Sequence, residues 1–143
     1  MIYPPLIKYA SEGEYYRHYI ERYCKRQIYT FDDIRVYFSK DQFKDAFFES
    51  SSRVERKKDF FSFKRAERID WIEVALSDKS SEIYSGWDRD KRIYTVKRRV
   101  ILVHGNYVVI IQMKKDKTAF FITAYIAGEN TLKKIKNSPR LYP

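Results

Sequence analysis

YVVIIQMKKDKTAFFITAYI, the sequence of residues 107–126, holds two β-rich runs separated by a charged turn. Residues 107–113 are apolar at successive positions, which is typical of a central strand with both faces buried. Residues 119–126 form the last predicted strand, and the turn between the two runs lies at 114–117. Gly105-Asn106, just before this stretch, is a two-residue hairpin signal. This part of the chain is therefore predicted to fold as an antiparallel meander.

The rest of the chain adds helices before the meander and further strands leading into it. Tyr15, Tyr19 and Tyr23 recur every four residues, which predicts a helix. Ser39 and Ser62 stand where the N-caps of two further helices are expected. In chain order, we expect a helix at 11–25, an extended segment at 27–38, helices at 39–48 and 64–76, strands at 83–85, 92–104, 107–113 and 119–126, and a helical turn at 132–136. Helices followed by a meander indicate an α+β fold in one domain, residues 1–143.

Positive charge is distributed unevenly along the chain. The net charge is +10 over 143 residues, and residues 1–50 contribute none of it because eight basic and eight acidic side chains cancel there. Residues 51–143 therefore carry the whole excess. Such a field attracts polyanions, and nucleic acid is the commonest polyanion that a protein in solution meets.

Composition narrows the class of protein. Hydrophobic residues make up 44% and aromatic residues 17% of the chain, which excludes a disordered basic tail. No apolar run approaches the roughly 18 residues that span a bilayer, and the first residues do not resemble a secretory signal. One cysteine and two histidines are too few for a typical zinc site. We therefore expect a cytoplasmic protein that needs no metal and no other cofactor.

The last predicted strand contains the residues best suited to chemistry. Regular alternation places Phe121, Thr123 and Tyr125 on one face of it, and residues 120, 122 and 124 on the other. On an open face, Thr123 can donate a hydrogen bond to a phosphate oxygen, and Tyr125 can stack on a base or donate its hydroxyl. The alternative is that both are ordinary strand and core residues.

Lys97, Arg98 and Arg99 lie consecutively within the long predicted strand 92–104. Alternation places Lys97 and Arg99 on one face and Arg98 on the other. Three cations are costly inside a strand unless they face an open surface or meet an anion, which favours phosphate binding. The alternative is an exposed edge strand whose charges prevent aggregation.

Arg65 and Arg68 lie in the first turns of the predicted helix 64–76. The helix dipole disfavours cations at that end, and an anion bound there would remove the conflict. Pairing with Glu67 and Asp70 is the alternative. His18 and His104 are either general bases, since the pKa of histidine lies near neutrality, or structural residues.

Two segments together resemble a known nuclease family. Residues 121–125, FITAY, and residues 60–72, FFSFKRAERIDWI, are similar to motifs of the phage and prophage barnase–EndoU–colicin–RelE-like (BECR-fold) nuclease domains. The run at 107–111 stands where that family has a strand rich in Val and Ile, and residues 133–139 are similar to its basic tail. The resemblance covers roughly residues 31–143. Asp45 stands where members of the family often have a histidine.

The resemblance implies N-terminal helices packed on a roughly four-stranded antiparallel sheet. It also implies a toxin-like, metal-independent endoribonuclease in which the ribose 2′-hydroxyl attacks the adjacent phosphate. RNA such as tRNA or mRNA is the implied substrate, and an acidic immunity or antitoxin protein is a second implied partner. The implied catalytic residues are Asp45, Arg65, Thr123 and Tyr125. The implied nucleic-acid-binding residues are Lys44, Lys64, Arg68, Lys97, Arg98, Arg99, Lys133 and Lys134.

Two alternatives keep the same basic face and give up the cleavage. In the first, the domain grips RNA or DNA without cutting it, and Asp45 in place of histidine supports this reading. In the second, the basic face meets an acidic protein, and the abundance of Tyr and Arg suits such an interface. Salt-sensitive binding without products would identify the first.

Overall fold

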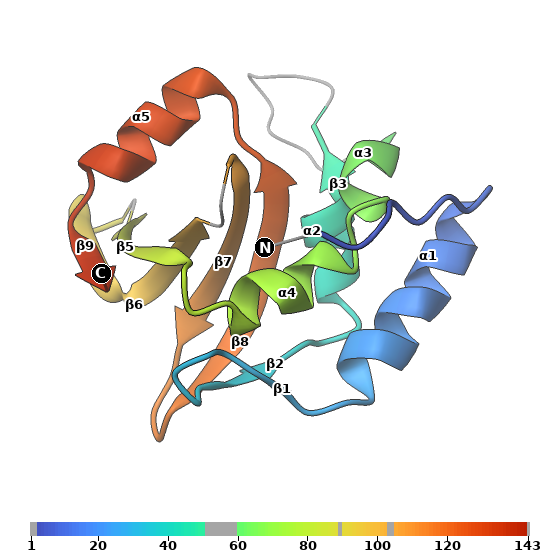
Figure 1. Ribbon diagram of the computed structural model, residues 1–143, viewed down its shortest axis with the longest axis horizontal. Helices are drawn as coiled ribbons and strands as arrows, with labels where there is room; N and C mark the ends of the chain where they lie inside the picture. Colours follow the sequence, from blue (N-terminus) through green and yellow to red (C-terminus); the bar gives the residue numbers. More distant parts are fainter. Residues whose placement is uncertain (1–2, 51–59, 89, 103–104, 143) are drawn as a thin grey trace.

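The computed structural model describes residues 3–50, 60–88, 90–102 and 105–142. Its main element is a seven-stranded mixed sheet with the strand order β1-β2-β8-β7-β6-β5-β9, beside a separate pair formed by β3 and β4 (Figure 1). The strands are β1 (Ile28–Tyr29), β2 (Arg35–Tyr37), β3 (Phe48–Glu49), β4 (Phe60–Phe61), β5 (Glu82–Asp88), β6 (Ile93–Leu102), β7 (Tyr107–Met113), β8 (Thr118–Ile126) and β9 (Arg140–Tyr142). The helices are α1 (Glu12–Tyr19), continued by the π-helical turn η1 (Ile20–Cys24), α2 (Gln42–Phe47), α3 (Phe63–Ala66), α4 (Trp71–Ser77) and α5 (Glu129–Asn137).

The centre of the sheet is the meander expected from the sequence. β5, β6, β7 and β8 pair antiparallel in chain order. β7 is interior, and Val108 and Val109 are fully buried on its two faces. Gly105 has a φ of 99° in the turn between β6 and β7, a conformation that glycine adopts without steric cost. Antiparallel pairing of β6 with β7 confirms a hairpin here, but Leu102 pairs with Val108, a register one residue away from that of a two-residue Gly105-Asn106 turn.

The expectation of helices packed on a four-stranded antiparallel sheet was wrong. Three further strands, β1, β2 and β9, extend the meander at both edges. β2 runs parallel to β8, with Arg35 opposite Thr118 and Tyr37 opposite Phe120, and this pair makes the sheet mixed. Each added strand is only two or three residues long, too short for an alternating pattern to reveal it.

The first predicted helix is present but changes its winding halfway. Ser11 caps α1 by accepting a hydrogen bond from the amide of Glu14, and the chain continues directly into η1. Tyr15, Tyr19 and Tyr23 are all buried, as their spacing predicts. In the next predicted helix, Phe43, Ala46 and Phe47 turn the inner side of α2 toward the core.

The predicted helix at 64–76 is two short helices, α3 and α4, separated by a tight turn. Ser62 caps α3 as expected, because its hydroxyl accepts the amide of Arg65. The buried phenol of Tyr23 then holds the turn: it donates to the carbonyl of Ile69 at 2.6 Å and accepts the amide of Glu73 at 3.2 Å. A side chain from η1 therefore supplies hydrogen bonds that a continuous helix would have made itself.

Apolar side chains gather on both faces of the sheet. The larger cluster lies between one face and the helices α1 to α4, and it includes Tyr19, Ile72 and Phe121. A smaller cluster on the other face joins Val100 and Tyr125 to Ile135 of α5. In Figure 1, α5 accordingly lies apart from the other helices, near β5 and β9. We call the face under α5 the second face of the sheet.

An irregularity in β8 decides which of its side chains reach the second face. Phe121 pairs with Ile111, but Thr123 pairs with Ile110, so Ile122 is an extra residue in a β-bulge. Phe121 consequently packs in the larger cluster, whereas Tyr125 packs in the smaller one. The prediction that Phe121 shares a face with Thr123 and Tyr125 was wrong because regular alternation fails at this bulge.

Candidate nucleic-acid interface

Arg65 links three elements at the edge of the second face. Its Nη1 donates to the carbonyl of Ala46 in the last turn of α2 at 3.2 Å. The same atom donates to the hydroxyl of Thr123 in β8 at 3.4 Å. Only 16% of the Arg65 side chain is exposed, so the guanidinium is largely removed from water. A cation in this position is held by short-range contacts and is poorly hydrated.

Glu49 and Tyr125 complete the surroundings of Arg65. Nη2 lies 3.9 Å from Oε1 of Glu49, beyond hydrogen-bond distance, and 39% of the Glu49 side chain is exposed. The guanidinium carbon lies 5.3 Å from the centre of the Tyr125 ring, within the range of a cation–π interaction. We call Arg65, Glu49, Thr123 and Tyr125 the Arg65 cluster.

Burial sets the protonation of this cluster. It lowers the pKa of Arg65, and the charges of Glu49 and Tyr125 act in the opposite direction. Arginine remains protonated even so, because its pKa starts above 12. Burial also raises the pKa of Tyr125, although the positive charge of Arg65 opposes this shift. At neutral pH the cluster therefore presents a cation beside a protonated phenol.

Local sequence explains why these side chains meet. The side-chain amide of Gln42 donates through Nε2 to the backbone carbonyl of Ile122 at 2.7 Å, which fixes α2 against the bulge of β8. The bulge turns Thr123 and Tyr125 toward the second face. The cap at Ser62 begins α3 just three residues before Arg65. Sequence reasoning predicted Arg65, Thr123 and Tyr125, and the structure places them together.

Sequence reasoning missed Glu49 and Gln42. Glu49 lies in a two-residue strand beside a charged stretch, where no periodic pattern distinguishes one acidic side chain from another. Gln42 bonds to a carbonyl 80 residues away, which leaves no local signal in the sequence. Asp45 and Lys44, which sequence reasoning did select, are exposed on the outer side of α2. The described residues thus place Glu49, rather than Asp45, beside Arg65.

The arrangement of α3 changes the hypothesis for Arg68 and Lys64. α3 has a single turn, so it has no helix dipole of the size assumed for a helix at 64–76. Arg68 donates to the carbonyl of Lys64 at 2.7 Å and lies over the ring of Trp71 at 5.2 Å. Lys64 itself is exposed. Arg68 therefore acts within the turn between α3 and α4.

Lys97, Arg98 and Arg99 take three different positions. β6 is interior where Arg98 and Arg99 pair with β7, so the edge-strand alternative does not apply to these two, whereas Lys97 lies just before the first recorded pair with β7. Arg99 pairs with Asp32 at 2.9 Å, and Lys97 is exposed. Arg98 is partly buried and packs so closely on Gly86 that a Cβ atom there would lie 2.4 Å from its Cγ. The described contacts connect none of these three to Arg65.

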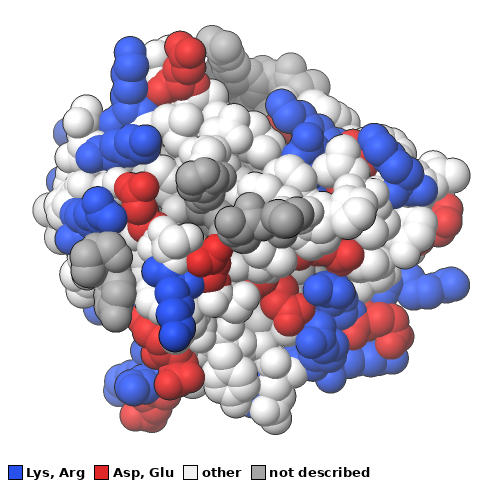
Figure 2. Space-filling view, viewed as in Figure 1, with Lys and Arg blue, Asp and Glu red and all other residues white. Residues whose placement is uncertain are grey.

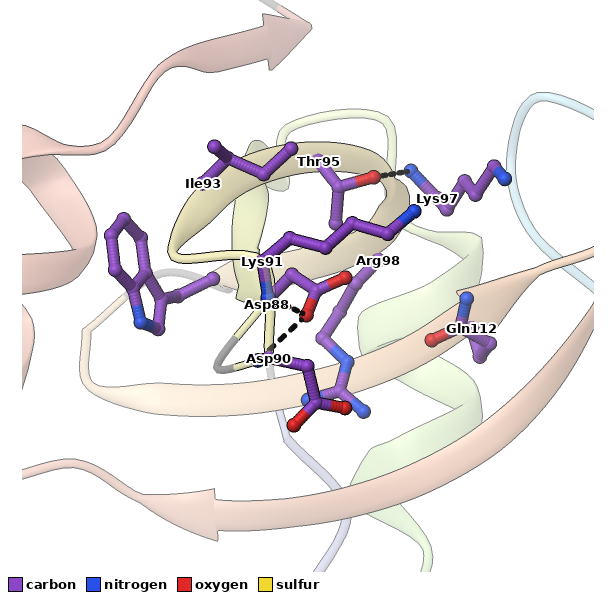
Figure 3. A pocket seen from close by; sticks show the side chains of 9 residues that line it. Asp88, Asp90, Lys91, Ile93, Thr95, Lys97, Arg98 and Gln112 are labelled. Atoms are coloured by element: carbon purple, nitrogen blue, oxygen red, sulfur yellow. Dashed lines mark hydrogen bonds between the residues drawn. The ribbon is translucent and has the colours of Figure 1, made fainter.

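A cavity of about 430 Å³ lies beside Arg98 at the β5–β6 hairpin (Figure 3). Arg98 and Gln112 enter it from neighbouring strands, and Lys91 and Lys97 add positive charge. Asp88 shapes the hairpin by accepting the backbone amides of residues 90 and 91. Asp88 and Asp90 also line this cavity, so it offers the second face a pocket of mixed charge with one more basic than acidic side chain, in addition to the Arg65 cluster.

The remaining candidates lie elsewhere. Both ring nitrogens of His18 are engaged, with Tyr9 at 2.9 Å and Asp70 at 2.7 Å, which gives it a structural position between α1 and α4. His104 lies outside the described residues. Lys133 and Lys134 are exposed on α5. Basic side chains are therefore spread over several elements.

The view in Figure 2 shows how charge is distributed on the side of the molecule that carries α4. Lys and Arg gather toward the margins, with Asp and Glu among them. The described residues contain no group of three or more His, Cys, Asp or Glu side chains arranged to hold a metal ion. Nor does the described part of the chain include a helix with the length and apolar character needed to cross a bilayer.

Comparisons with known proteins gave no relative from which a function could be proposed. No family model matches the chain, and neither the curated proteins nor the solved structures gave a significant match. The nuclease resemblance is thus not tested by relatives. What can be argued is the chemistry of the Arg65 cluster and of the second face on which it lies.

Proposed function

We propose that this protein binds RNA across the second face of its sheet and cleaves it at the Arg65 cluster without a metal ion. One observation carries the proposal: a largely buried arginine of α3 lies within contact of a hydroxyl and a phenol of β8 and a carboxylate of β3. Buried cations are costly unless they serve to bind an anion or to stabilise a negative charge. A phosphodiester matches that need.

The proposed reaction is a transesterification within RNA. The 2′-oxygen of the ribose attacks the adjacent phosphorus and forms a bond to it, while the bond from phosphorus to the 5′-oxygen breaks. The proton of the 2′-hydroxyl passes to a base, and the departing 5′-oxygen takes a proton from an acid. The products are a 2′,3′-cyclic phosphate and a free 5′-hydroxyl, and no oxidant or further reactant is consumed.

The Arg65 cluster supplies a group for each role. Glu49 is the general base, because it is a partly exposed carboxylate that is not hydrogen-bonded to Arg65. Tyr125 is the general acid, because burial raises its pKa and keeps the phenol protonated. Arg65 and the hydroxyl of Thr123 stabilise the charge that develops on the phosphate oxygens. After release of the product, Glu49 gives up to solvent the proton that it took, and Tyr125 takes one from solvent, which restores both groups.

The bound RNA would continue from the reacting phosphate across the second face of the sheet. Arg98 and Gln112 are paired across β6 and β7, and Gln112 is paired with Phe120 of β8. Two strand spacings, roughly 10 Å, separate β8 from β6. The Arg98 guanidinium can therefore hold a neighbouring phosphate of the same strand, as proposed from sequence for the basic run at 97–99.

The test is cleavage of a defined oligoribonucleotide by the purified protein in EDTA, followed by analysis of the new ends. Cyclic 2′,3′-phosphates are expected, and an oligonucleotide that carries 2′-deoxyribose at the cleaved position should stay intact. If the all-ribose oligonucleotide binds in a salt-sensitive manner but remains uncut after prolonged incubation, the protein is a binding module and the proposed cleavage is refuted.

Variants assign the roles. Arg65→Lys should lower the rate by about 100- to 1000-fold, and Tyr125→Phe and Glu49→Gln by about 100- to 10,000-fold each. Arg17→Lys is the matched control, because Arg17 is an exposed arginine on α1 and its replacement should leave the rate unchanged. Asp45→Asn tests the base chosen from sequence: a loss as large as that of Glu49→Gln would move the role to Asp45.

The same proposal includes the acidic partner protein expected from the sequence. Cleavage of RNA in the cytoplasm would be toxic to its own cell, which calls for an acidic immunity or antitoxin protein that covers the second face. Electrostatic complementarity would make that association fast and dependent on salt. Co-purification of such an acidic protein from cells that express the chain from its native locus would support this part.

A further inference from the structure

A cavity of about 510 Å³ lies between α5 and the β5–β6 hairpin. Trp87 and Tyr94 form one wall, and their rings meet edge to face with centres 5.0 Å apart. Val100 and Ile135 form the apolar floor. Such a space, with aromatic walls and a mostly apolar lining, suits a planar ring.

Both aromatic side chains at this cavity are unusually open to solvent. Trp87 and Tyr94 are each 46% exposed although they belong to paired strands. Large aromatic side chains bury much of their area when they can, so an exposed pair marks a binding surface. Neighbouring Ile93 and Val96 are also exposed, and this extends the apolar surface along the hairpin.

Charge around the cavity favours an anionic occupant. Lys134 of α5 lines it directly, and α5 carries Lys133 and Lys136 as well. The adjoining cavity shares Trp87 and adds Arg98. An aromatic platform interleaved with cations is the combination that binds single-stranded nucleic acid, where bases stack and phosphates meet positive charge.

The cavity lies on the same face of the sheet as Tyr125 of the Arg65 cluster. Val100 and Ile135, which form its floor, pack in the same apolar cluster as Tyr125. Trp87 lies on β5 and Tyr125 on β8, three strand spacings or roughly 14 Å apart across the sheet. The row of pairs that contains Tyr125 meets β5 at Glu82, five residues before Trp87, so the two backbone positions are roughly 22 Å apart. One strand of a few nucleotides can therefore reach both places.

We propose that the cavity between α5 and the wall formed by Trp87 and Tyr94 is a second subsite, which stacks one unpaired base of the RNA bound at the Arg65 cluster. This inference rests on the proposed function, and it specifies the substrate as single-stranded. A paired base cannot enter, because its faces are already covered by its neighbours in the duplex. Lys134 holds the phosphate attached to the stacked nucleotide.

Intrinsic fluorescence gives a direct test, because the chain has two tryptophans with different surroundings. Trp71 is stacked on Tyr3 and donates to the carbonyl of Pro4, whereas Trp87 is open. The probe is a single-stranded 2′-O-methyl oligoribonucleotide, which lacks the attacking hydroxyl and cannot be cleaved. It should quench the emission of the wild type, and Trp87→Phe should remove the quenching while binding remains.

Affinity provides a second readout. Trp87→Ala should weaken binding of the same oligonucleotide, measured by fluorescence anisotropy, by about 5- to 150-fold. Tyr29→Ala is the matched control, because Tyr29 is 45% exposed on β1 at the far edge of the sheet. Its replacement should change affinity less than twofold. Circular dichroism of both variants should match the wild type.

The outcomes separate the subsite from the function. Tight binding without quenching, and with no loss in Trp87→Ala, would overturn the subsite and leave RNA cleavage standing. Equal quenching by a perfectly paired duplex of the same sequence would overturn the single-stranded specificity. Failure of the wild type to bind any of the oligonucleotides would remove the proposed function together with the subsite.

Discussion

Removal of one hydroxyl, in Tyr23→Phe, should weaken the whole domain. The Tyr23 side chain is buried, with 1% of its surface exposed, and its phenol bridges the turn between α3 and α4. It donates to the carbonyl of Ile69 and accepts the amide of Glu73. Phenylalanine fills nearly the same volume, so the substitution isolates the hydrogen bonds from the packing of the ring.

The expected loss follows from the two groups left behind. An unpaired polar group in a buried position costs about 1–3 kcal/mol. The carbonyl of Ile69 is buried and would keep only the long, 3.4 Å bond from the amide of Ile72, while the amide of Glu73 lies in a partly buried position. We therefore expect the free energy of unfolding to fall by about 2 kcal/mol. For a chain of this length, that corresponds to a decrease of about 4–8 °C in Tm.

Urea denaturation followed by circular dichroism measures this change. Tyr29→Phe is the control, because the exposed Tyr29 phenol donates a hydrogen bond to the likewise exposed side chain of Gln27. Its loss should be below about 0.5 kcal/mol. A loss in Tyr23→Phe no larger than that of the control would refute the role assigned to the Tyr23 phenol in holding the turn before α4.

Three further changes test other parts of the structure. Gly86→Ala should destabilise the fold by about 1–3 kcal/mol in urea denaturation, because its Cβ would lie 2.4 Å from Cγ of Arg98. Gly13→Ala, on open surface in α1, should instead stabilise by about 0.4–1 kcal/mol, and equal effects at both sites would contradict the close packing. Burial raises the pKa of Asp32, but hydrogen bonds from Thr30 and Arg99 and the charge of Arg99 outweigh it and leave the pKa below 3.8. Stability from this carboxylate is therefore present above that pH and lost as the pH falls through the lower folded value, so Asp32→Asn should flatten the acid limb of a stability–pH curve; an unchanged limb would refute the assignment.

Strong local patterns predicted the centre of the fold correctly. The apolar run at 107–113 and the Gly105-Asn106 turn place β7 and its hairpin. Residues 27–38 were expected to be extended, and β1 and β2 lie there, but their place in the sheet was not predicted; the edge strand β9 escaped prediction altogether, because its three residues gain their stability from pairing with β5. Such pairing depends on tertiary contacts, which local propensity does not contain.

The site was predicted in part for similar reasons. Arg65, Thr123 and Tyr125 were selected by their chemistry, and they are the residues that the fold brings together. The ion pair that engages Arg99 but not Arg98 could not be predicted, because its partner Asp32 lies 67 residues away. Glu49 was overlooked, because its proximity to Arg65 exists only after α2 and α3 pack together.

The extra residue in β8, Ile122, lengthens the strand without taking part in its pairing with β7. Phe121 and Thr123 pair with consecutive residues of β7, so deletion of Ile122 would preserve every recorded pair and the face of every remaining side chain. The carbonyl that Gln42 grips would be lost. Ile122 therefore supplies a hydrogen-bond acceptor for α2. A strand one residue shorter would still present Thr123, but it would lose a bond that fixes the helix whose Ala46 carbonyl accepts from Arg65.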